Sequence, residues 1–396
     1  MPSRHGLCNQ DGVHAGETSL AIAPSDPVPG MPPIETFNAI LTKALEVGAS
    51  DVHISAGGPY RMRVRGTMAP VAGVPSLTPD DTLQIAATIL LNARRVRADT
   101  LEAELDGLQD VDCSYSVPGV GRFRANLCSQ RGSVSVVLRA IADKIPDFEQ
   151  LGLPAVLSEI TSEERGMVLL TGTTGSGKST TLASMVGFLN QRRAGKIITI
   201  EDPIEFLHRD ARSNVVQREI GSDSSSFESA LRAALRQDPD VILVGEMRDR
   251  ATIDVALKAA ETGHLVFSTV HTTDAQRTIA RLVSVFDPSE QIAARLRLAE
   301  SLRAVISQRL LPRADGQGRV VAVEVMRNTA TIAECIADPD KTSAMRDHIA
   351  AGRTQYGMQT FDQHLTELYR GGQVTLEVAM GAATSSADFE RNLQFQ

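Results

Sequence analysis

Hydrophobic positions in the first third of the chain follow two different periods. Between residues 34 and 45 apolar side chains recur every three or four positions, which predicts an amphipathic helix that ends at Gly48. Apolar and polar residues then alternate as in strands, in the segments DVHIS, RMRVRG, VDCSYSVP, GRFRANLC and SVSVVLRAI. The pattern predicts a small mixed α+β domain over residues 33–145, built on an antiparallel sheet.

Beyond residue 145 the pattern changes. A stretch with two prolines and a glycine, KIPDFEQLGLP, indicates a linker over residues 146–160 that includes a short helix. The apolar segments MVLL, KIITI, VILVG and HLVFSTV follow, with helical patterns between them. Such continuous apolar runs are typical of strands buried on both faces of a parallel sheet. They predict an α/β domain over residues 161–396 whose last part is helical.

Capping pairs indicate where two helices of this second domain begin. Ser225 and Glu228 have the spacing of a capping box before an apolar face. Thr360 and Gln363 repeat that spacing, and Gly371 is expected to end the helix that they open.

Composition changes this picture in a few respects. Residues 1–32 are rich in Pro, Gly and Ser without a period, which predicts a disordered tail. The formal net charge is -8, so no overall positive field attracts nucleic acid. The four cysteines lack the spacing of a metal or redox motif, which favours reduced thiols in the cytoplasm. No apolar run approaches the ~20 residues that span a bilayer.

The clearest chemical motif lies between the strand MVLL and the helix that follows it. Residues 172–180 read GTTGSGKST, which satisfies the pattern G-x-x-x-x-G-K-[ST]. Backbone N–H groups and the positive helix end can hold phosphate oxygens there, while the lysine neutralises the outer phosphates and the first serine after it ligates Mg²⁺. The predicted nucleotide-binding residues are Gly172, Thr173, Thr174, Gly175, Ser176, Gly177, Lys178, Ser179 and Thr180. ATP and Mg²⁺ are the expected cofactors.

Titratable residues follow three of the apolar strands. KIITI is followed by Glu201 and Glu205, VILVG by Glu246, and HLVFST ends near His271. Ligands of open parallel sheets bind beyond the carboxyl ends of the strands, so these side chains should converge on the phosphate loop. A carboxylate there can activate the attacking water or hold a magnesium-bound water, and an imidazole can sense the terminal phosphate.

Two other polar residues lie at the opposite ends of these strands. His264 precedes LVFSTV and Asp240 precedes VILVG. For His264 a structural hydrogen bond is as good an interpretation as a chemical role, and for Asp240 we favour a cap or turn over a metal ligand.

Several long motifs resemble those of the secretion-superfamily ATPases. ITIEDPIEF (198–206), LRAALRQDPDVILVGEMRD (231–249) and AAETGHLVFSTVHTTDA (259–275) are similar to the acidic box, the Walker B region and the histidine box of that superfamily. ASDVHIS (49–55), GRFRANLCSQRG (121–132) and GMQTFDQHL (357–365) resemble segments of the ATPases that retract type IV pili. The likeness runs from about Ile34 to the end of the chain.

The resemblance implies a PAS-like N-terminal domain, a RecA-like motor domain and a homo-hexameric ring with ATP at the subunit junctions. It implies Glu205 as the catalytic acid-box residue, Glu246 as the Walker B acid that holds Mg²⁺ through water, and His271 as the phosphate sensor. Arginines from a neighbouring subunit would stabilise the phosphoryl charge. The candidates are Arg122, Arg124 and Arg139, for which solvated positions on a sheet face are an equal alternative.

The implied function is retraction of a type IV pilus by removal of pilin, which underlies twitching motility. The partner would be the inner-membrane platform protein of the pilus machine, contacted from the cytoplasm. Alternatives in the same superfamily are an accessory retraction ATPase and a pilus-assembly or secretion ATPase. From other classes, a nucleic-acid translocase is disfavoured by the acidic balance and the absence of an aromatic and basic stripe. A small-molecule phosphotransferase lacks an evident acceptor pocket.

Overall fold

The computed structural model describes residues 33–142 and 144–395. The chain divides into two compact units, Met1–Ala140 and Ile141–Gln396. The predicted tail, residues 1–32, lies outside the described residues. Segment 146–160 belongs to the second unit and reaches the first residues of α4 (Val156–Thr161), where Leu157 is fully buried.

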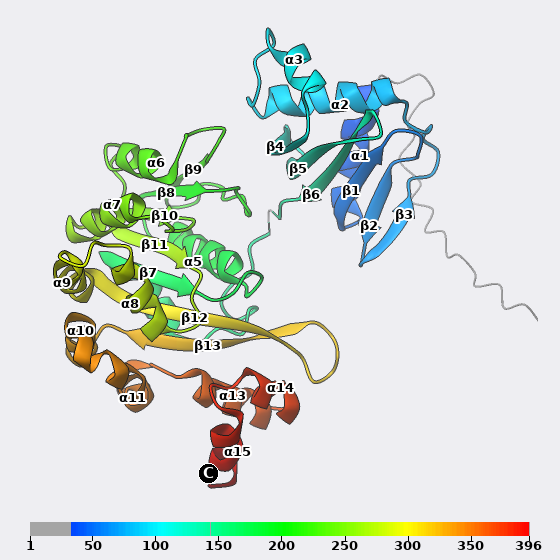
Figure 1. The fold of residues 1–396 in the computed structure, drawn as a ribbon. Coiled ribbons are helices and arrows are strands. Elements are labelled where there is room, and N and C mark those ends of the chain that lie inside the picture. The colour runs from blue at the N-terminus through cyan, green and yellow to red at the C-terminus, as the bar shows by residue number, and fades with distance from the viewer. Residues whose placement is uncertain (1–32, 143, 396) are drawn as a thin grey trace, which may run out of the picture. The chain divides into compact units, whose positions relative to one another are not determined.

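The first unit is built on a six-stranded antiparallel sheet (Figure 1). Its order is β3-β2-β1-β6-β5-β4. The strands are β1 (Ala49–Ser55), β2 (Arg61–Val64), β3 (Thr67–Pro70), β4 (Asp110–Val117), β5 (Gly121–Gln130) and β6 (Ser133–Ala140). Five of them coincide with the alternating segments of the sequence. The short β3 was not predicted.

Two long helices and a short one complete this unit: α1 (Pro33–Glu46), α2 (Pro79–Asn92) and α3 (Leu101–Asp106). The predicted first helix is α1, whose Phe37 and Leu41 are fully buried. Helix α2 begins with a complete capping box between Thr78 and Asp81, and it buries Ile85 and Ile89. These apolar residues form one core with Phe123 of β5 and its neighbours.

The second unit contains a seven-stranded sheet of order β13-β12-β7-β11-β10-β8-β9. Its strands are β7 (Gly166–Thr171), β8 (Lys196–Glu201), β9 (Asn214–Glu219), β10 (Val241–Val244), β11 (Leu265–Val270), β12 (Leu302–Pro312) and β13 (Arg319–Arg327). All neighbours are parallel except β12 and β13. The four apolar segments predicted as buried strands are β7, β8, β10 and β11, and every residue of β7, β10 and β11 is buried.

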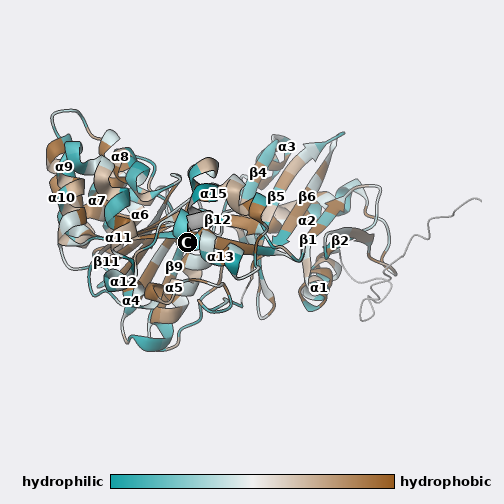
Figure 2. Cartoon of the chain, turned by 90° about the horizontal axis from the view of Figure 1, so that it is seen from below, coloured by the Kyte–Doolittle hydropathy of each residue, from teal (hydrophilic) through white to brown (hydrophobic). Residues whose placement is uncertain are grey.

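Helices cover both faces of this sheet. They are α5 (Lys178–Arg192), α6 (Phe227–Ala234), α7 (Arg250–Glu261), α8 (Ala275–Ser284) and α9 (Gln291–Ser301), besides α4. Alternate residues of β7 enter different cores: Met167 packs with α6 to α9, and Val168 packs with α4 and α5. This layering explains why the strands are apolar at every position. In Figure 2 the strands are mostly brown, while the outer helix faces carry teal residues.

The predicted helical last part of the domain is interrupted by two strands in residues 302–327, which were not predicted. These residues form β12, which pairs in parallel with β7, and β13, which returns antiparallel. The remaining elements are helical: α10 (Ala330–Ala337), the 3₁₀ turn η1 (Pro339–Ala344), α11 (Met345–Ala351), α12 (Arg353–Tyr356), α13 (Phe361–Arg370), α14 (Leu376–Ala382) and α15 (Ser386–Phe395). The sequence of β12 and β13 is apolar without a clear period, so tertiary pairing with β7 decides their conformation.

The two predicted helix starts have different outcomes. Thr360 and Gln363 form the full capping box of α13, and Gly371 is its C-cap residue. Helix α6 is capped by Ser226, whose hydroxyl accepts from the N–H of Ser229, and not by Ser225. Among the described residues, no helix has both the length and the apolar content that crossing a membrane requires.

Candidate nucleotide-binding site

The glycine-rich loop leaves the carboxyl end of β7 and opens α5, so it lies at the centre of the sheet edge where ligands of such folds bind. Gly172 has a φ of +143°, and a Cβ on it would lie 2.5 Å from the carbonyl oxygen of Gln308. Gly177, the N-cap residue of α5, has a φ of +92°. Both positions require glycine, which lets the backbone N–H groups turn toward one point.

Lys178 is held by the loop that precedes it. Its Nζ donates to the carbonyl oxygens of Gly172 and Thr173, both at 2.9 Å. Burial lowers the pKa of Lys178, and the carboxylates of Glu205 and Glu246 act in the opposite direction. A desolvated cation near two acids can exchange its carbonyl partners for phosphate oxygens at little cost in reorganisation.

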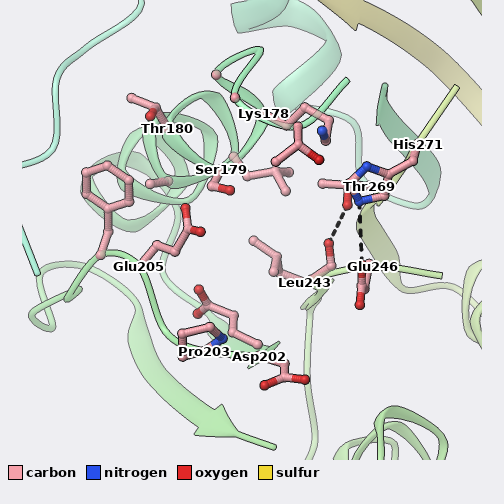
Figure 3. A pocket seen from close by; sticks show the side chains of 18 of the residues that line it. Lys178, Ser179, Thr180, Asp202, Pro203, Glu205, Leu243, Glu246, Thr269 and His271 are labelled. Atoms are coloured by element: carbon pink, nitrogen blue, oxygen red, sulfur yellow. Dashed lines mark hydrogen bonds and ion pairs between the residues drawn. The ribbon is translucent and has the colours of Figure 1, made fainter. Parts of the chain in front are cut away.

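A pocket of about 440 Å³ opens beside this lysine. Its lining includes the loop residues Thr174, Gly175, Gly177, Lys178, Ser179 and Thr180, together with Glu201, Glu205, Glu246 and His271. The expected convergence of strand-end residues on the phosphate loop is therefore present. In Figure 3, Lys178 and Glu205 face the same space, with Ser179 between them.

Glu205 reaches the pocket through a turn after β8. The turn contains a cis peptide bond before Pro203, and the side chain of Ile204 is buried. The N–H of Ile204 donates to Oε2 of Glu219 in the neighbouring strand β9 at 3.2 Å. The residue before Glu205 is thus tied to the sheet, which aims Glu205 at the P-loop.

Glu201 is directed differently. Its Oε1 accepts from the hydroxyl of Thr199 at 2.6 Å and from Nε2 of Gln217 at 3.2 Å. Burial raises the pKa of Glu201. Both contacts hold its carboxylate against β8 and β9, so Glu201 supports the floor of the pocket.

Glu246 and His271 lie together at the ends of β10 and β11. Nε2 of His271 is 3.6 Å from Oε2 of Glu246, and Nε of Arg248 is 2.7 Å from Oε1 of Glu246. The hydroxyl of Thr269 donates to the carbonyl of Gly245 at 2.6 Å, which joins the two strand ends (Figure 3). The imidazole can therefore link a phosphate oxygen to the acidic residue beside it.

His264 and Asp240 occupy the far edge of the sheet, as expected. Nδ1 of His264 lies 2.9 Å from the carbonyl of Ala259, which is the structural hydrogen bond considered above. Oδ2 of Asp240 accepts from the N–H of Lys196 at 2.7 Å. Asp240 thus joins the starts of β10 and β8 and has a structural role.

Phe206, His208, Leu310 and Arg319 are among the pocket residues that were not predicted from the sequence. Phe206 and His208 follow Glu205 in the same segment. The sequence analysis would have included both if the set of site residues had been extended three positions beyond Glu205. Burial lowers the pKa of His208 to about 4, which keeps this imidazole neutral. Leu310 and Arg319 come from β12 and β13, and no local signal in the sequence brings that hairpin to the nucleotide.

The three candidate arginines lie in the first unit. Nη2 of Arg122 donates to the hydroxyl of Ser114 at 3.0 Å, and Arg124 lies 4.0 Å from Asp112. Nε of Arg139 donates to Oδ1 of Asp51 at 2.9 Å, although the Arg139 side chain is 70% exposed. Arg124 and Arg139 are direct partners across β5 and β6, so they share a face of the sheet.

The oxygen ligands that Mg²⁺ prefers are present at the pocket. The hydroxyl of Ser179 and the carboxylate of Glu246 both line it, and such groups fit a hard cation that also binds phosphate. Within the described part of the chain, no three His, Cys, Asp or Glu side chains cluster as a metal cage. The residues therefore suit a cation that arrives with a nucleotide.

Residues 30–393 match the protein family described as "Type II/IV secretion system protein". The chain is 43% identical to the type IV pilus retraction ATPase PilT of Pseudomonas aeruginosa, over 88% of this chain and 98% of PilT. It is 38% identical to the type IV pilus ATPase PilU of that bacterium, over 89% of this chain and 90% of PilU.

Solved structures agree with these relatives. The crystal structure of the pilus retraction motor PilT with bound ADP has a TM-score of 0.79 and 44% identity, covering 89% of this chain and 98% of that one. The ATPase DotB of Legionella pneumophila has a TM-score of 0.77 and 29% identity, with 91% and 99% covered.

These likenesses confirm the predicted fold class, an N-terminal domain followed by a RecA-like ATPase domain. They also confirm the predicted ATPase activity, and the ADP in a neighbouring structure supports the expectation that the chain binds a nucleotide. The chain belongs to the type II/IV secretion system protein family, as an ATPase of the PilT type.

Proposed function

We propose that this ATPase works as a cytoplasmic homo-hexamer that drives type IV pilus retraction by removing pilin at an inner-membrane platform protein. The observation that carries the proposal is the convergence of Glu205, Glu246 and His271 on the pocket of Lys178. It occurs in a chain that spans 98% of a relative named as a retraction ATPase. ATP hydrolysis at this site would provide the energy, and the name of that relative indicates that the energy is used to retract a pilus.

Within the pocket, Glu205 orients and deprotonates the attacking water. Its carboxylate lies near enough to Lys178 to influence the pKa of that amine, which supports a position close to the phosphate that Lys178 would bind. His271 contacts the same phosphate and reports its presence to Glu246, 3.6 Å away. Hydrolysis then changes the contacts of the β10 and β11 ends together.

Magnesium would be held by Ser179 and, through water, by Glu246. When bound, it would neutralise charge on the phosphates. Lys178 and the loop N–H groups orient the nucleotide in the same region.

Arg122, Arg124 and Arg139 would complete the pocket of a neighbouring copy in the ring. Arg139 is the most exposed of the paired arginines on this face, and its ion pair with Asp51 keeps the guanidinium extended along the sheet. An arginine supplied across an interface stabilises the phosphoryl charge only when two subunits meet, which makes hydrolysis depend on assembly.

Deletion of the gene tests whether this ATPase retracts pili. A retraction motor predicts cells with abundant surface pili that do not move by twitching, and restoration of movement by the intact gene but not by Lys178→Ala. Loss of pili after deletion would instead identify an assembly ATPase and overturn the proposal.

An accessory retraction ATPase is a second candidate, because the chain is 38% identical to PilU over 90% of that protein. The same deletion separates the two. An accessory motor predicts pili that still retract without load, with a lower stalling force in an optical trap.

A further inference from the structure

Glu324 is a buried carboxylate that does not line the nucleotide pocket. It lies in the middle of β13 and is 6% exposed. Its Oε1 accepts from the N–H of Ala275 at 2.8 Å and from the hydroxyl of Ser307 at 3.3 Å. Burial of a carboxylate costs free energy because the group loses its contacts with water. The contacts that replace the water are therefore informative.

The first of these contacts reaches the histidine loop. Ala275 is the first residue of α8, and three residues separate it from His271. The loop between them is fixed to the first turn of α8. The hydroxyls of Thr272 and Thr278 lie 2.7 Å apart, and Arg277 donates to the hydroxyl of Thr273 at 2.7 Å. A shift of the α8 N-terminus would therefore move the loop that carries the imidazole.

The second contact leads to the phosphate loop. Ser307 and Gln308 are neighbours in β12. Nε2 of Gln308 donates to the hydroxyl of Thr181, in the first turn of α5, at 2.8 Å. Strand β12 thus contacts the helix that follows the P-loop through Gln308, and it contacts Glu324 through Ser307.

We propose that Glu324 is a positioning residue that holds the His271 loop at a fixed place relative to the P-loop, through its hydrogen bond to the N–H of Ala275. The proposal rests on the function assigned to His271 above. Glu324 acts on hydrolysis only through that loop, because its carboxylate contacts α8 and β12 and not the pocket.

Two substitutions at this position separate the hydrogen bond from the packing. Glu324→Gln keeps an oxygen that can accept from Ala275, whereas Glu324→Leu has similar volume and no acceptor. In the full-length protein, Glu324→Leu should lower the kcat of ATP turnover about tenfold, the value of one aligned hydrogen bond, with KM and ADP affinity within about twofold. Glu324→Gln should stay within about twofold of the wild type.

The deciding measurement repeats these substitutions in a His271→Ala background. If Glu324 acts through His271, then Glu324→Leu causes no further loss there. An equal loss in both backgrounds overturns the positioning function and leaves that of His271 intact. Full turnover by His271→Ala alone overturns the function of His271 itself, and the inference with it.

A second variant guards against misfolding of Glu324→Leu. Ala275→Pro removes the donor at a helix position that tolerates proline, and its Cδ displaces the Glu324 carboxylate from its present contact. Its kcat should fall as in Glu324→Leu, again only where His271 is present. Wild-type kcat in a folded Ala275→Pro protein, judged by an unchanged Tm, overturns the proposal.

Discussion

Lys178 brings a positive charge to the nucleotide pocket. In the proposed mechanism Lys178 binds the phosphate, and Glu205 is the carboxylate that activates water next to it. The amine is 2.9 Å from two loop carbonyls, and the field of Glu205 reaches it. Lys178 keeps its charge when Glu205 is removed, so ATP should still bind without Glu205 but should not react. A substitution at one residue should therefore be able to abolish hydrolysis without abolishing ATP binding.

Glu205→Gln tests this separation. The amide keeps the size of the side chain and removes the base, so turnover should fall by ~10² to 10⁴ while ATP still binds. Single-turnover hydrolysis and nucleotide titration of the same sample measure both. Glu228→Gln, an exposed change on α6, is the matched control and should retain activity. Full turnover in Glu205→Gln would remove Glu205 from the mechanism.

Glu324 should make the protein less stable as pH rises. Burial raises its pKa from 4.5 to about 7, with Asp274 adding to the shift and Ala275, Ser307 and Arg309 opposing it. Between these values the unfolded chain has lost a proton that the folded chain keeps, so rising pH favours unfolding. The loss is absent below the lower value and reaches about 3 kcal/mol above the upper one.

Glu324→Gln cannot ionise and should lack this loss. Its Tm should therefore rise relative to the wild type between about pH 5 and pH 8, the window set by the two pKa values. The exposed Glu377→Gln should follow the wild-type curve. Parallel curves for Glu324→Gln and the wild type would mean that Glu324 stays charged in the fold.

At the scale of elements, the sequence predicts best where one local rule decides. Strands buried on both faces are apolar throughout, so β7, β10 and β11 were identifiable. The P-loop was identifiable from its own motif between β7 and α5. The convergence of Glu205, Glu246 and His271 then needs only the parallel direction of the strands.

What could not be predicted depends on contacts between distant segments. Strands β12 and β13 exist because β12 pairs with β7, more than a hundred residues earlier in the chain. Leu310 and Arg319 reach the pocket only as a result of that pairing. The bond between Glu324 and Ala275 has the same origin, since no local pattern relates β13 to α8.

The capping box of α13 gives a prediction at this scale. Thr360 accepts from the N–H of Gln363, and Oε1 of Gln363 accepts from the N–H of Thr360. Thr360→Ala should lower the free energy of unfolding by about 1 kcal/mol, because it leaves an N–H of the first turn without its acceptor. Calorimetry measures the loss, and hydrogen exchange should show faster exchange in the first turn of α13.

Thr366→Ala is the control in the same helix. Its hydroxyl only bonds back to the carbonyl of Asp362, and alanine is the better helix former. Stability within about 0.5 kcal/mol of the wild type is expected. Equal effects of the two changes would show that the hydroxyl of Thr360 does not act as a cap.

At the scale of the whole molecule, the proposed function requires copies of the chain that complete each other's nucleotide pockets. Arg124 and Arg139 share a sheet face in the first unit, where they pair with the aspartates Asp112 and Asp51. The Arg124–Asp112 pair is exposed on both sides and contributes less than about 1 kcal/mol to stability, so its removal should leave the fold intact. Asp51 is buried, but Arg63 stays 3.9 Å from its carboxylate when Arg139 is removed. A large effect on turnover would then be a contribution to chemistry.

Mixing of inactive variants tests whether that contribution crosses a subunit boundary. Arg139→Ala should lose ~10³-fold or more in turnover, as expected for a phosphoryl-stabilising arginine, and Glu205→Gln should lose ~10² to 10⁴, as expected for a catalytic base. A mixture of the two should recover part of the activity, because an intact pocket of the arginine variant can meet an intact Arg139 from its neighbour.

Arg122→Ala and Arg124→Ala are tested in the same way. Arg61→Ala changes an exposed residue of β2, and this variant should keep its activity without a second variant in the mixture. Turnover that stays independent of protein concentration, with no recovery on mixing, would place every required group within one chain.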